Sequence, residues 1–314
     1  MCVPRGGVCD VVGAPGLFDG DARAPVGAGS AVSGNVSASG GRVSRLYFAV
    51  VGDTRPATVD DTGAYPMAIA RKIFQDVQSL DPPPLFGIST GDYVFASPQG
   101  GQAAAQFDLY SYARSAFSGV MFPAMGNHEC TGATASNCGA GNADGITDNY
   151  TQFLAKMLRP LGQSKPYYAI EIDSSLDAWT AKFVFVAPNA WDDVQAAWLD
   201  ATLARPTTYT FIVRHEPKSA DTAPGVGPSE AIVARYPHTL TIVGHSHTYA
   251  RSASDEVIFG NGGAPLTSPT ATYGFGLFEQ RPDGSIRVDA IDYAAMQRDG
   301  AFAFAITPTG LQAP

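Results

Sequence analysis

The sequence predicts an α/β protein in which part of the strand pairing is antiparallel. Short apolar runs typical of buried strands alternate with segments whose apolar residues recur at helical spacing through most of the chain. Near the C-terminus, two strand-like segments flank Pro282-Asp283-Gly284, which predicts a β-hairpin. The 314 residues, 45% of them hydrophobic, suit one large α/β domain or two small ones with an ample core.

The elements follow from these patterns in chain order. Residues 1–44 are rich in Gly, Ala and Ser with little periodicity, and we interpret them as an N-terminal extension before a domain at 45–314. The first helix ends before three consecutive prolines, Pro82 to Pro84, which cannot continue a helix. The predicted strands are 46–51, 85–89, 120–124, 167–172, 182–187, 209–213, 239–243, 271–280 and 285–293, and the predicted helices are 69–80, 102–117, 149–161 and 194–203.

Charge and hydropathy exclude several classes of partner. The net charge is −9 and no run of Lys or Arg occurs, so we expect no nucleic-acid partner, because such binding depends on a basic patch. A small anionic substrate stays possible, since bound metal ions can supply local positive charge. No apolar run approaches the ~20 residues of a membrane span. We therefore expect no membrane-spanning segment, and the sequence leaves the oligomeric state open.

The four cysteines form two close pairs, Cys2/Cys9 and Cys130/Cys138. An even number with local pairing predicts two disulfides, one of which would clip the N-terminal extension. Disulfides require an oxidising compartment, so we expect a secreted or periplasmic protein whose signal peptide has been removed. A zinc site is one alternative, although neither pair has C-x-x-C spacing. In another alternative, Cys2 carries the lipid of a lipoprotein and leaves Cys9 unpaired.

Polar side chains follow five of the predicted strands where each strand ends. A single Gly-Asp after a strand is usually a turn, and a His pair there can simply be solvated, but five such endings are hard to produce by chance. Carboxylates, a carboxamide and imidazoles are the ligands that hold two divalent ions of borderline hardness. A shared carboxylate can hold the ions ~3.5–4 Å apart, which suits attack on a phosphorus ester. The clusters are Asp53, Asp92, Asn127/His128, His215 and His245/His247.

The order of these motifs resembles that of the calcineurin-like metallophosphoesterases over about residues 46–251. The resemblance implies a four-layer α-β-β-α sandwich, in which two mixed sheets pack face to face with helices outside. It also implies hydrolysis of a small phosphate ester by hydroxide held between two divalent or mixed-valence ions of Zn, Mn or Fe. The matching motifs are Gly52-Asp53-Thr54-Arg55, Gly91-Asp92-Tyr93, Gly126-Asn127-His128-Glu129, a lone His215 and Gly244-His245-Ser246-His247.

The resemblance further implies a role for each motif residue. His128 would stand near the leaving group and could protonate it as a general acid; alternatively, it orients a ligand. The metal ligands would be Asp53 and His247 for the first ion, Asp92 as the bridge, and Asn127, His215 and His245 for the second ion.

Two departures from the family pattern concern the first ion. The family usually has a histidine where this chain has Arg55, and the Gly-His-Ser-His-Thr-Tyr-Ala-Arg run resembles the purple acid phosphatases, a branch that also lacks that histidine. That branch has a tyrosine three residues after the bridging aspartate, where this chain has Phe95. Tyr93 would face the other way on an extended chain, so we expect no tyrosinate-to-iron colour.

Arg55 carries the main functional hypothesis from the sequence. A guanidinium cannot bind a cation but binds phosphoryl oxygens well, so we expect Arg55 to contact the substrate. In the alternative, Arg55 turns away to pair with Asp60 or Asp61. The loss of the first-motif histidine also leaves open a non-catalytic or weakly active binding module with the same fold.

Overall fold

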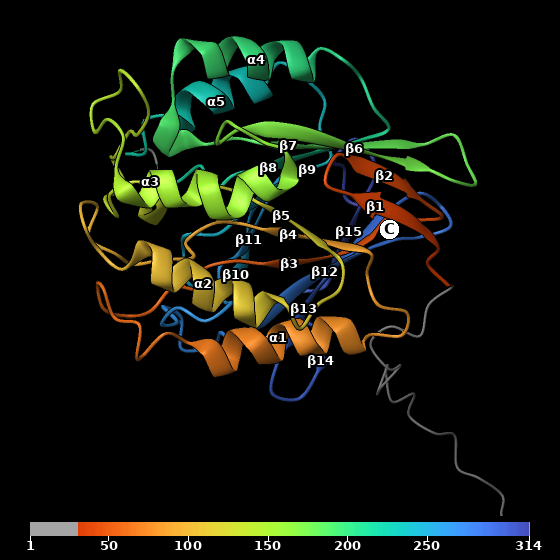
Figure 1. Ribbon diagram of the computed structural model, residues 1–314. Coiled ribbons are helices and arrows are strands. Elements are labelled where there is room, and N and C mark those ends of the chain that lie inside the picture. Colours follow the sequence, from red (N-terminus) through yellow and green to blue (C-terminus); the bar gives the residue numbers. More distant parts are fainter. Residues whose placement is uncertain (1–30, 221, 314) are drawn as a thin grey trace, which may run out of the picture.

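Four layers in the order α-β-β-α make up the computed structural model, which describes residues 31–220 and 222–313 (Figure 1). Within these residues, one sheet of eight strands has the order β1-β2-β6-β7-β8-β9-β11-β10. The other, of seven strands, has the order β14-β13-β12-β3-β4-β5, with β15 paired to β13. Parallel and antiparallel pairs occur in both sheets, which confirms the predicted fold class.

The bounds of the elements agree with most of the predicted ranges. The first sheet contains β1 Gly34–Ser37, β2 Gly40–Val43, β6 Tyr168–Ser174, β7 Thr180–Phe185, β8 Tyr209–Val213, β9 Leu240–Val243, β10 Tyr249–Ala253 and β11 Glu256–Phe259. The second contains β3 Tyr47–Val51, β4 Phe86–Ser89, β5 Val120–Pro123, β12 Gly274–Gln280, β13 Ile286–Asp292, β14 Gln297–Arg298 and β15 Phe304–Ile306. The helices are α1 Met67–Ser79, α2 Ala103–Arg114, α3 Asp148–Phe153, α4 Asp193–Leu203 and α5 Val226–Val233.

Helices cover the outer faces of both sheets. In Figure 1, α1 and α2 lie outside the sheet that contains β3, and α4 and α5 lie outside the sheet that contains β8. The α1 helix buries one stripe, with Ala70, Ile73, Phe74 and Val77 almost fully covered, because apolar residues three and four positions apart share a helix face. The central strands are therefore buried on both faces, which explains their mostly apolar sequences.

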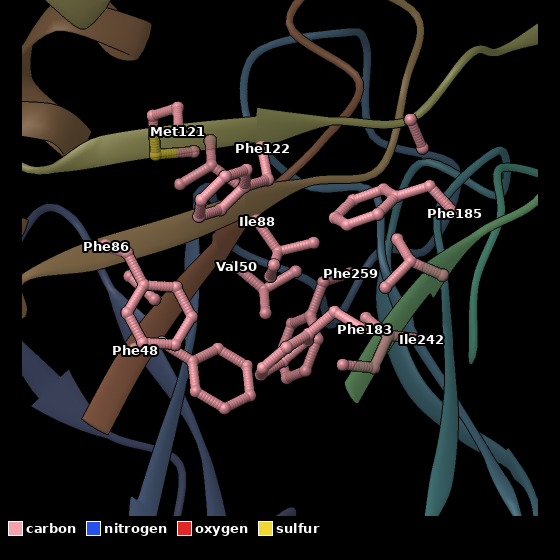
Figure 2. Close-up of a cluster of buried hydrophobic side chains, with 14 of the residues drawn as sticks. Phe48, Val50, Phe86, Ile88, Met121, Phe122, Phe183, Phe185, Ile242 and Phe259 are labelled. Atoms are coloured by element: carbon pink, nitrogen blue, oxygen red, sulfur yellow. The ribbon is translucent and has the colours of Figure 1, made fainter. Parts of the chain in front are cut away.

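Aromatic side chains fill the space between the two sheets (Figure 2). Phe48 from β3 meets Phe183 from β7 edge to face, with ring centroids 5.1 Å apart, and Phe183 stacks on Phe211 from β8 at 4.9 Å. All three side chains have no exposed surface. Burying a side chain of this size contributes about 1.5–3 kcal/mol, so this layer fixes how the strand ends of the two sheets face one another.

Some local predictions need correction or extension. Part of the predicted N-terminal extension forms the β1–β2 hairpin, whose second strand pairs in parallel with β6 at the sheet edge. The predicted helix at 149–161 is split into α3, a π-helical turn at Leu154–Leu158 and a 3-10 turn at Arg159–Leu161. Helix α5 was not predicted because its Gly227 and Pro228 are poor helix formers, although Pro is tolerated in a first turn.

One of the two predicted disulfides lies within the described residues. Cys130 and Cys138 are bonded, with their Cα atoms 5.6 Å apart, and both are fully buried. The pair closes a loop that directly follows Asn127 and His128. Cys2 and Cys9 lie outside the described residues, so the prediction of a second disulfide stays a prediction.

Candidate metal centre

The predicted ligands gather where parallel strands from both sheets end. Strands β3, β4 and β5 lie side by side in parallel and are followed by Asp53, Asp92 and Asn127. Strands β8 and β9 are parallel neighbours in the other sheet and are followed by His215 and His245. Because the carboxyl ends of parallel strands meet at one edge, the loops after these strands bring the side chains together.

Three of these residues have a left-handed backbone. Asp53, Asp92 and His245 have φ angles of 57°, 56° and 67°, which non-glycine residues seldom adopt. Each such conformation costs about 1–3 kcal/mol and persists where neighbouring contacts enforce it. The His245 backbone N–H donates to both carboxylate oxygens of Asp53, at 3.1 Å each, and so supplies one enforcing contact.

Gly244 is required for close approach. The left-handed residue at the end of β9 is His245, which directly follows Gly244. A Cβ at residue 244 would lie 2.4 Å from Asp53 Oδ2 and 2.6 Å from Thr90 Oγ1. Only glycine therefore lets strand β9 come this close to the end of β3.

Four donor atoms surround one position, which is where the sequence predicts the second ion. Asp92 Oδ1 lies 3.2 Å from His215 Nε2, which lies 3.3 Å from His245 Nδ1. His245 Nδ1 in turn lies 3.2 Å from Asn127 Oδ1. Tetrahedral ligands at ~2.1 Å from one ion lie ~3.4 Å apart, so these spacings fit a bound divalent cation.

Backbone carbonyls orient two of the histidines. His215 Nδ1 lies 2.8 Å from the Thr90 carbonyl, and His247 Nδ1 lies 2.8 Å from the Pro265 carbonyl. A carbonyl only accepts, so each Nδ1 carries the proton and each Nε2 presents a lone pair in the neutral ring. This is the arrangement that a metal-binding histidine usually has.

Burial and mutual charge shift the pKa values of the cluster. Burial opposes ionisation of Asp92, but the charges of His215, His128 and Arg55, together with the hydrogen bond to His215, outweigh burial and hold the Asp92 pKa well below its usual range. Burial likewise opposes the charged form of His215, yet the Asp92 and Asp53 carboxylates, together with the hydrogen bond to Asp92, raise the His215 pKa well above its usual value. Burial, then the charge of His215, lowers the pKa of His245 to about 4, so His245 keeps its lone pair at neutral pH. A cation can therefore replace the proton of His215 next to an ionised carboxylate.

Two buried glutamates adjoin this position. Glu129 accepts backbone N–H bonds from Asp92, Gly126 and Tyr93 at 2.8–2.9 Å, so it fixes the Asp92 loop. Neither carboxylate oxygen of Glu216 finds a hydrogen-bond partner among the described residues, although Glu216 has no exposed surface. Glu216, His215 and His245 offer ligand atoms within 4.8 Å of one another. A buried carboxylate without partners is costly, and a cation beside it removes that cost.

The position predicted for the first ion has a different occupant. His247 Nε2 lies 3.7 Å from Asp53 Oδ1, but the Arg55 guanidinium lies against the same ligands. Arg55 Nη2 is 3.3 Å from His247 Nε2, and Arg55 Nε is 3.4 Å from Asp92 Oδ2. The donor set for a second ion therefore fits a metal, whereas the donor set for a first ion is engaged by a fixed positive charge.

His128 lies beside the bridging carboxylate. Its Nε2 is 3.8 Å from Asp92 Oδ2, and its Nδ1 has no hydrogen-bond partner within the described part of the chain. Burial lowers the His128 pKa to about 4, although the Asp92 charge acts in the opposite direction. His128 is therefore neutral at neutral pH here, and a role as general acid needs an anion nearby to raise its pKa.

Phe95 and Tyr93 lie as the sequence suggested. The Phe95 ring packs between Arg55, whose Cζ is 4.8 Å from the ring centroid, and His128, whose ring centroid is 4.6 Å away. The Tyr93 hydroxyl donates to the Ala124 carbonyl at 3.0 Å and is buried away from the ligands. No tyrosine hydroxyl therefore takes the place of the missing first-motif histidine at these two positions.

The sequence did not reveal the burial of Arg214. Arg214 is ion-paired and has no exposed surface. Its guanidinium contacts Glu230 on α5 and Glu256 on β11, and its Nε donates to the Glu216 carbonyl at 2.7 Å. Arg214 thus fixes the backbone beside His215, a role that depends on partners distant in sequence.

Comparisons with known proteins show the fold. No family model and no curated protein matches the chain. A purple acid phosphatase from yellow lupin (Lupinus luteus) seeds has a TM-score of 0.61 and 14% identity over 86% of this chain. A 5'-nucleotidase from Candida albicans has a TM-score of only 0.40 and 11% identity over 80% of this chain. The chain spans 55% and 47% of these two structures, and the likeness to the lupin protein shows that the two share a fold.

Proposed function

We propose that this chain, which has the metallophosphoesterase fold, is a metal-dependent hydrolase of small phosphate esters. The observation that carries the proposal is the convergence of four donor atoms, from Asp92, Asn127, His215 and His245, at spacings of 3.2–3.3 Å. Oxygen and imidazole donors of this kind suit Zn, Mn or Fe. Such an ion, when bound, lowers the pKa of a coordinated water and polarises a phosphoryl oxygen.

The protein's own residues would supply three functions around that ion. Asp92 and His215 hold it, and the Thr90 carbonyl keeps His215 in the tautomer that can bind. Arg55, with its side chain 14% exposed, lies beside that ion against Asp92 Oδ2 and can bind phosphoryl oxygens through charge-assisted hydrogen bonds. His128 Nε2 lies 3.8 Å from Asp92 Oδ2, the oxygen that Arg55 also faces, and can donate to the leaving oxygen once an anionic ester is bound.

The setting of the chain is part of the proposal. The buried Cys130–Cys138 disulfide supports a secreted or periplasmic location, because such bonds persist in oxidising compartments. Within the described residues, no helix combines the length and apolar character that crossing a membrane requires. We assign the hydrolase domain to residues 45–314 together with the β1–β2 hairpin, whose second strand pairs with β6, and expect its partner to be a small ester rather than a nucleic acid.

A panel of aryl phosphate mono-, di- and triesters tests the proposal. The protein is stripped with a chelator and reloaded separately with Mn²⁺, Zn²⁺ or Fe²⁺. We expect hydrolysis of at least one ester class that disappears with the chelator and returns with metal. Asp92→Asn should abolish the activity, because Asp92 Oδ1 faces the proposed ion. Metal binding without turnover of any ester would instead identify a binding module and refute the hydrolase assignment.

A further inference from the structure

We infer that this centre binds one metal ion and that the Arg55 guanidinium takes the place of the second ion expected from the motifs. The inference rests on the proposed function only in that the centre binds metal. Its starting observation is the direction of the Arg55 side chain, which points into the ligand cluster. The two contacts that place it there are with His247 Nε2 at 3.3 Å and Asp92 Oδ2 at 3.4 Å.

The contact with His247 uses the electron pair that an ion would need. His247 Nδ1 is protonated, because it donates to the Pro265 carbonyl. The neutral ring therefore has one lone pair, on Nε2, and Arg55 Nη2 donates to it. An ion bound by His247 would lie ~2.1 Å from that nitrogen, inside the space of the guanidinium.

The surroundings hold Arg55 in this position. Its guanidinium stacks on the Phe95 ring at 4.8 Å, and its Nη1 donates to the Pro56 carbonyl at 3.0 Å. Its backbone N–H donates to the Asp92 carbonyl at 3.1 Å, which ties the two motifs together. Because the side chain is 14% exposed, leaving the cluster would cost contacts on several sides.

The carboxylates of Asp60 and Asp61, the alternative ion-pair partners of Arg55, accept hydrogen bonds from other groups. Asp60 accepts from the Ser97 and Gln102 backbone N–H groups at 3.0 and 2.8 Å and from the Ser97 hydroxyl. Asp61 accepts from the Ala64 backbone N–H at 2.8 Å. The alternative considered from the sequence, an ion pair with either residue, is therefore not what the described contacts show.

Charge favours the same arrangement. Asp53 is fully buried, and a buried carboxylate needs a nearby cation to balance its charge. A fixed guanidinium supplies that charge without a metal. A divalent ion added beside it would meet a like charge at close range, which opposes binding strongly in a buried site.

Counting bound ions tests the inference. The protein is reloaded with excess Mn²⁺, freed of unbound metal and measured by plasma mass spectrometry, and its Mn²⁺ resonance spectrum is recorded. We expect about one ion per chain with the spectrum of an isolated Mn²⁺. Arg55→His restores the family's usual ligand, so this variant should bind about two ions and show a magnetically coupled pair. Arg71→His, which makes the same change where Arg71 stacks on Tyr112 4.5 Å away, should stay at one ion.

The outcomes separate the inference from the proposed function. Two tightly held ions in the wild-type protein, or none, would overturn the inference whatever happens to the variants. If Arg55→His fails to fold, His247→Ala decides. On the one-ion arrangement this variant keeps one ion with affinity within about threefold of wild type, whereas loss of the ion would contradict the arrangement. One bound ion without ester hydrolysis would leave the inference standing and refute the proposed function.

Discussion

Replacing Gly244 with alanine tests whether the close approach of β9 to β3 builds the centre. The added Cβ would lie 2.4 Å from Asp53 Oδ2, so the carboxylate must move by about 1 Å to restore van der Waals contact. It would also lie 2.6 Å from Thr90 Oγ1, which donates to the Phe259 carbonyl at 3.0 Å. Overpacking of this kind costs about 1–3 kcal/mol. We therefore expect Gly244→Ala to lower the free energy of unfolding by that amount.

Metal affinity should fall in the same variant. Asp53 accepts the His245 backbone N–H, and the Thr90 carbonyl orients His215. A shift of Asp53 therefore moves His245, and a shift of Thr90 moves His215; both histidines are ligands of the proposed ion. Loss of such supporting contacts typically weakens metal binding by about 10–100-fold, so we expect the metal affinity of Gly244→Ala to fall by ~10-fold or more. Urea denaturation measures the stability of the metal-free protein, and calorimetric titration with Mn²⁺ or Zn²⁺ measures the affinity.

Gly227 in α5 provides the matched control. A Cβ at that position meets no atom within 4 Å among the described residues. Gly227→Ala should therefore leave metal affinity unchanged and change the free energy of unfolding by less than about 1 kcal/mol, because Gly227 lies in the first turn of α5 directly before Pro228, where the gain of a mid-helix alanine does not apply. If Gly244→Ala is as stable as wild type and binds metal equally well, the reasoning from close approach is wrong.

Three other predictions follow from contacts around the centre. Glu216→Gln should weaken metal binding by about tenfold, because it removes a buried charge beside His215 and His245. Unchanged affinity in a calorimetric titration would show that Glu216 does not interact with the ion. Glu256→Ala should cost about 3–5 kcal/mol in urea denaturation, because it leaves the buried Arg214 charge without a main partner. Glu230→Ala removes the other acidic partner of Arg214, whose side chain is partly exposed, and should lower the free energy of unfolding clearly less. The double variant Cys130→Ala, Cys138→Ala should lose about 2–3 kcal/mol by the loop-closure argument, and equal stability would contradict it.

The sequence predicted the parts of the fold in which local pattern and burial agree. Strands β3, β4, β8 and β9 are buried on both faces, so most of their residues had to be apolar. The polar residues directly after them could be recognised as a site because parallel strands end together. Hairpin β1–β2 was missed because its strands contain three glycines and expose most of their side chains at the sheet edge.

Contacts between residues distant in sequence could not be predicted from the sequence alone. Arg214 is buried because Glu230 and Glu256, in later elements, provide its counter-charges, and nothing adjacent to Arg214 signals that. Glu216 is fully buried without a hydrogen-bond partner among the described residues, and nothing adjacent to it in the sequence signals that state. In each case the residue type is visible in the sequence, whereas the physical state of the side chain depends on the packing of both sheets.

Arg55 shows why a departure from a motif needs the structure for its interpretation. The loss of a histidine ligand alone is compatible with a weak first ion, a side chain turned to solvent, or a substrate contact. Three contacts distinguish these possibilities. The Pro56 carbonyl and the Phe95 ring fix the Arg55 guanidinium, and the guanidinium donates to Nε2 of His247, which carries the one free lone pair of the neutral imidazole. Once Arg55 is fixed there, Asp53 and Asp92 have a permanent positive charge beside them. The strand ends of this fold can therefore balance two buried carboxylates with one ion and one guanidinium, and a phosphate ester would meet a metal on one side and hydrogen-bond donors on the other.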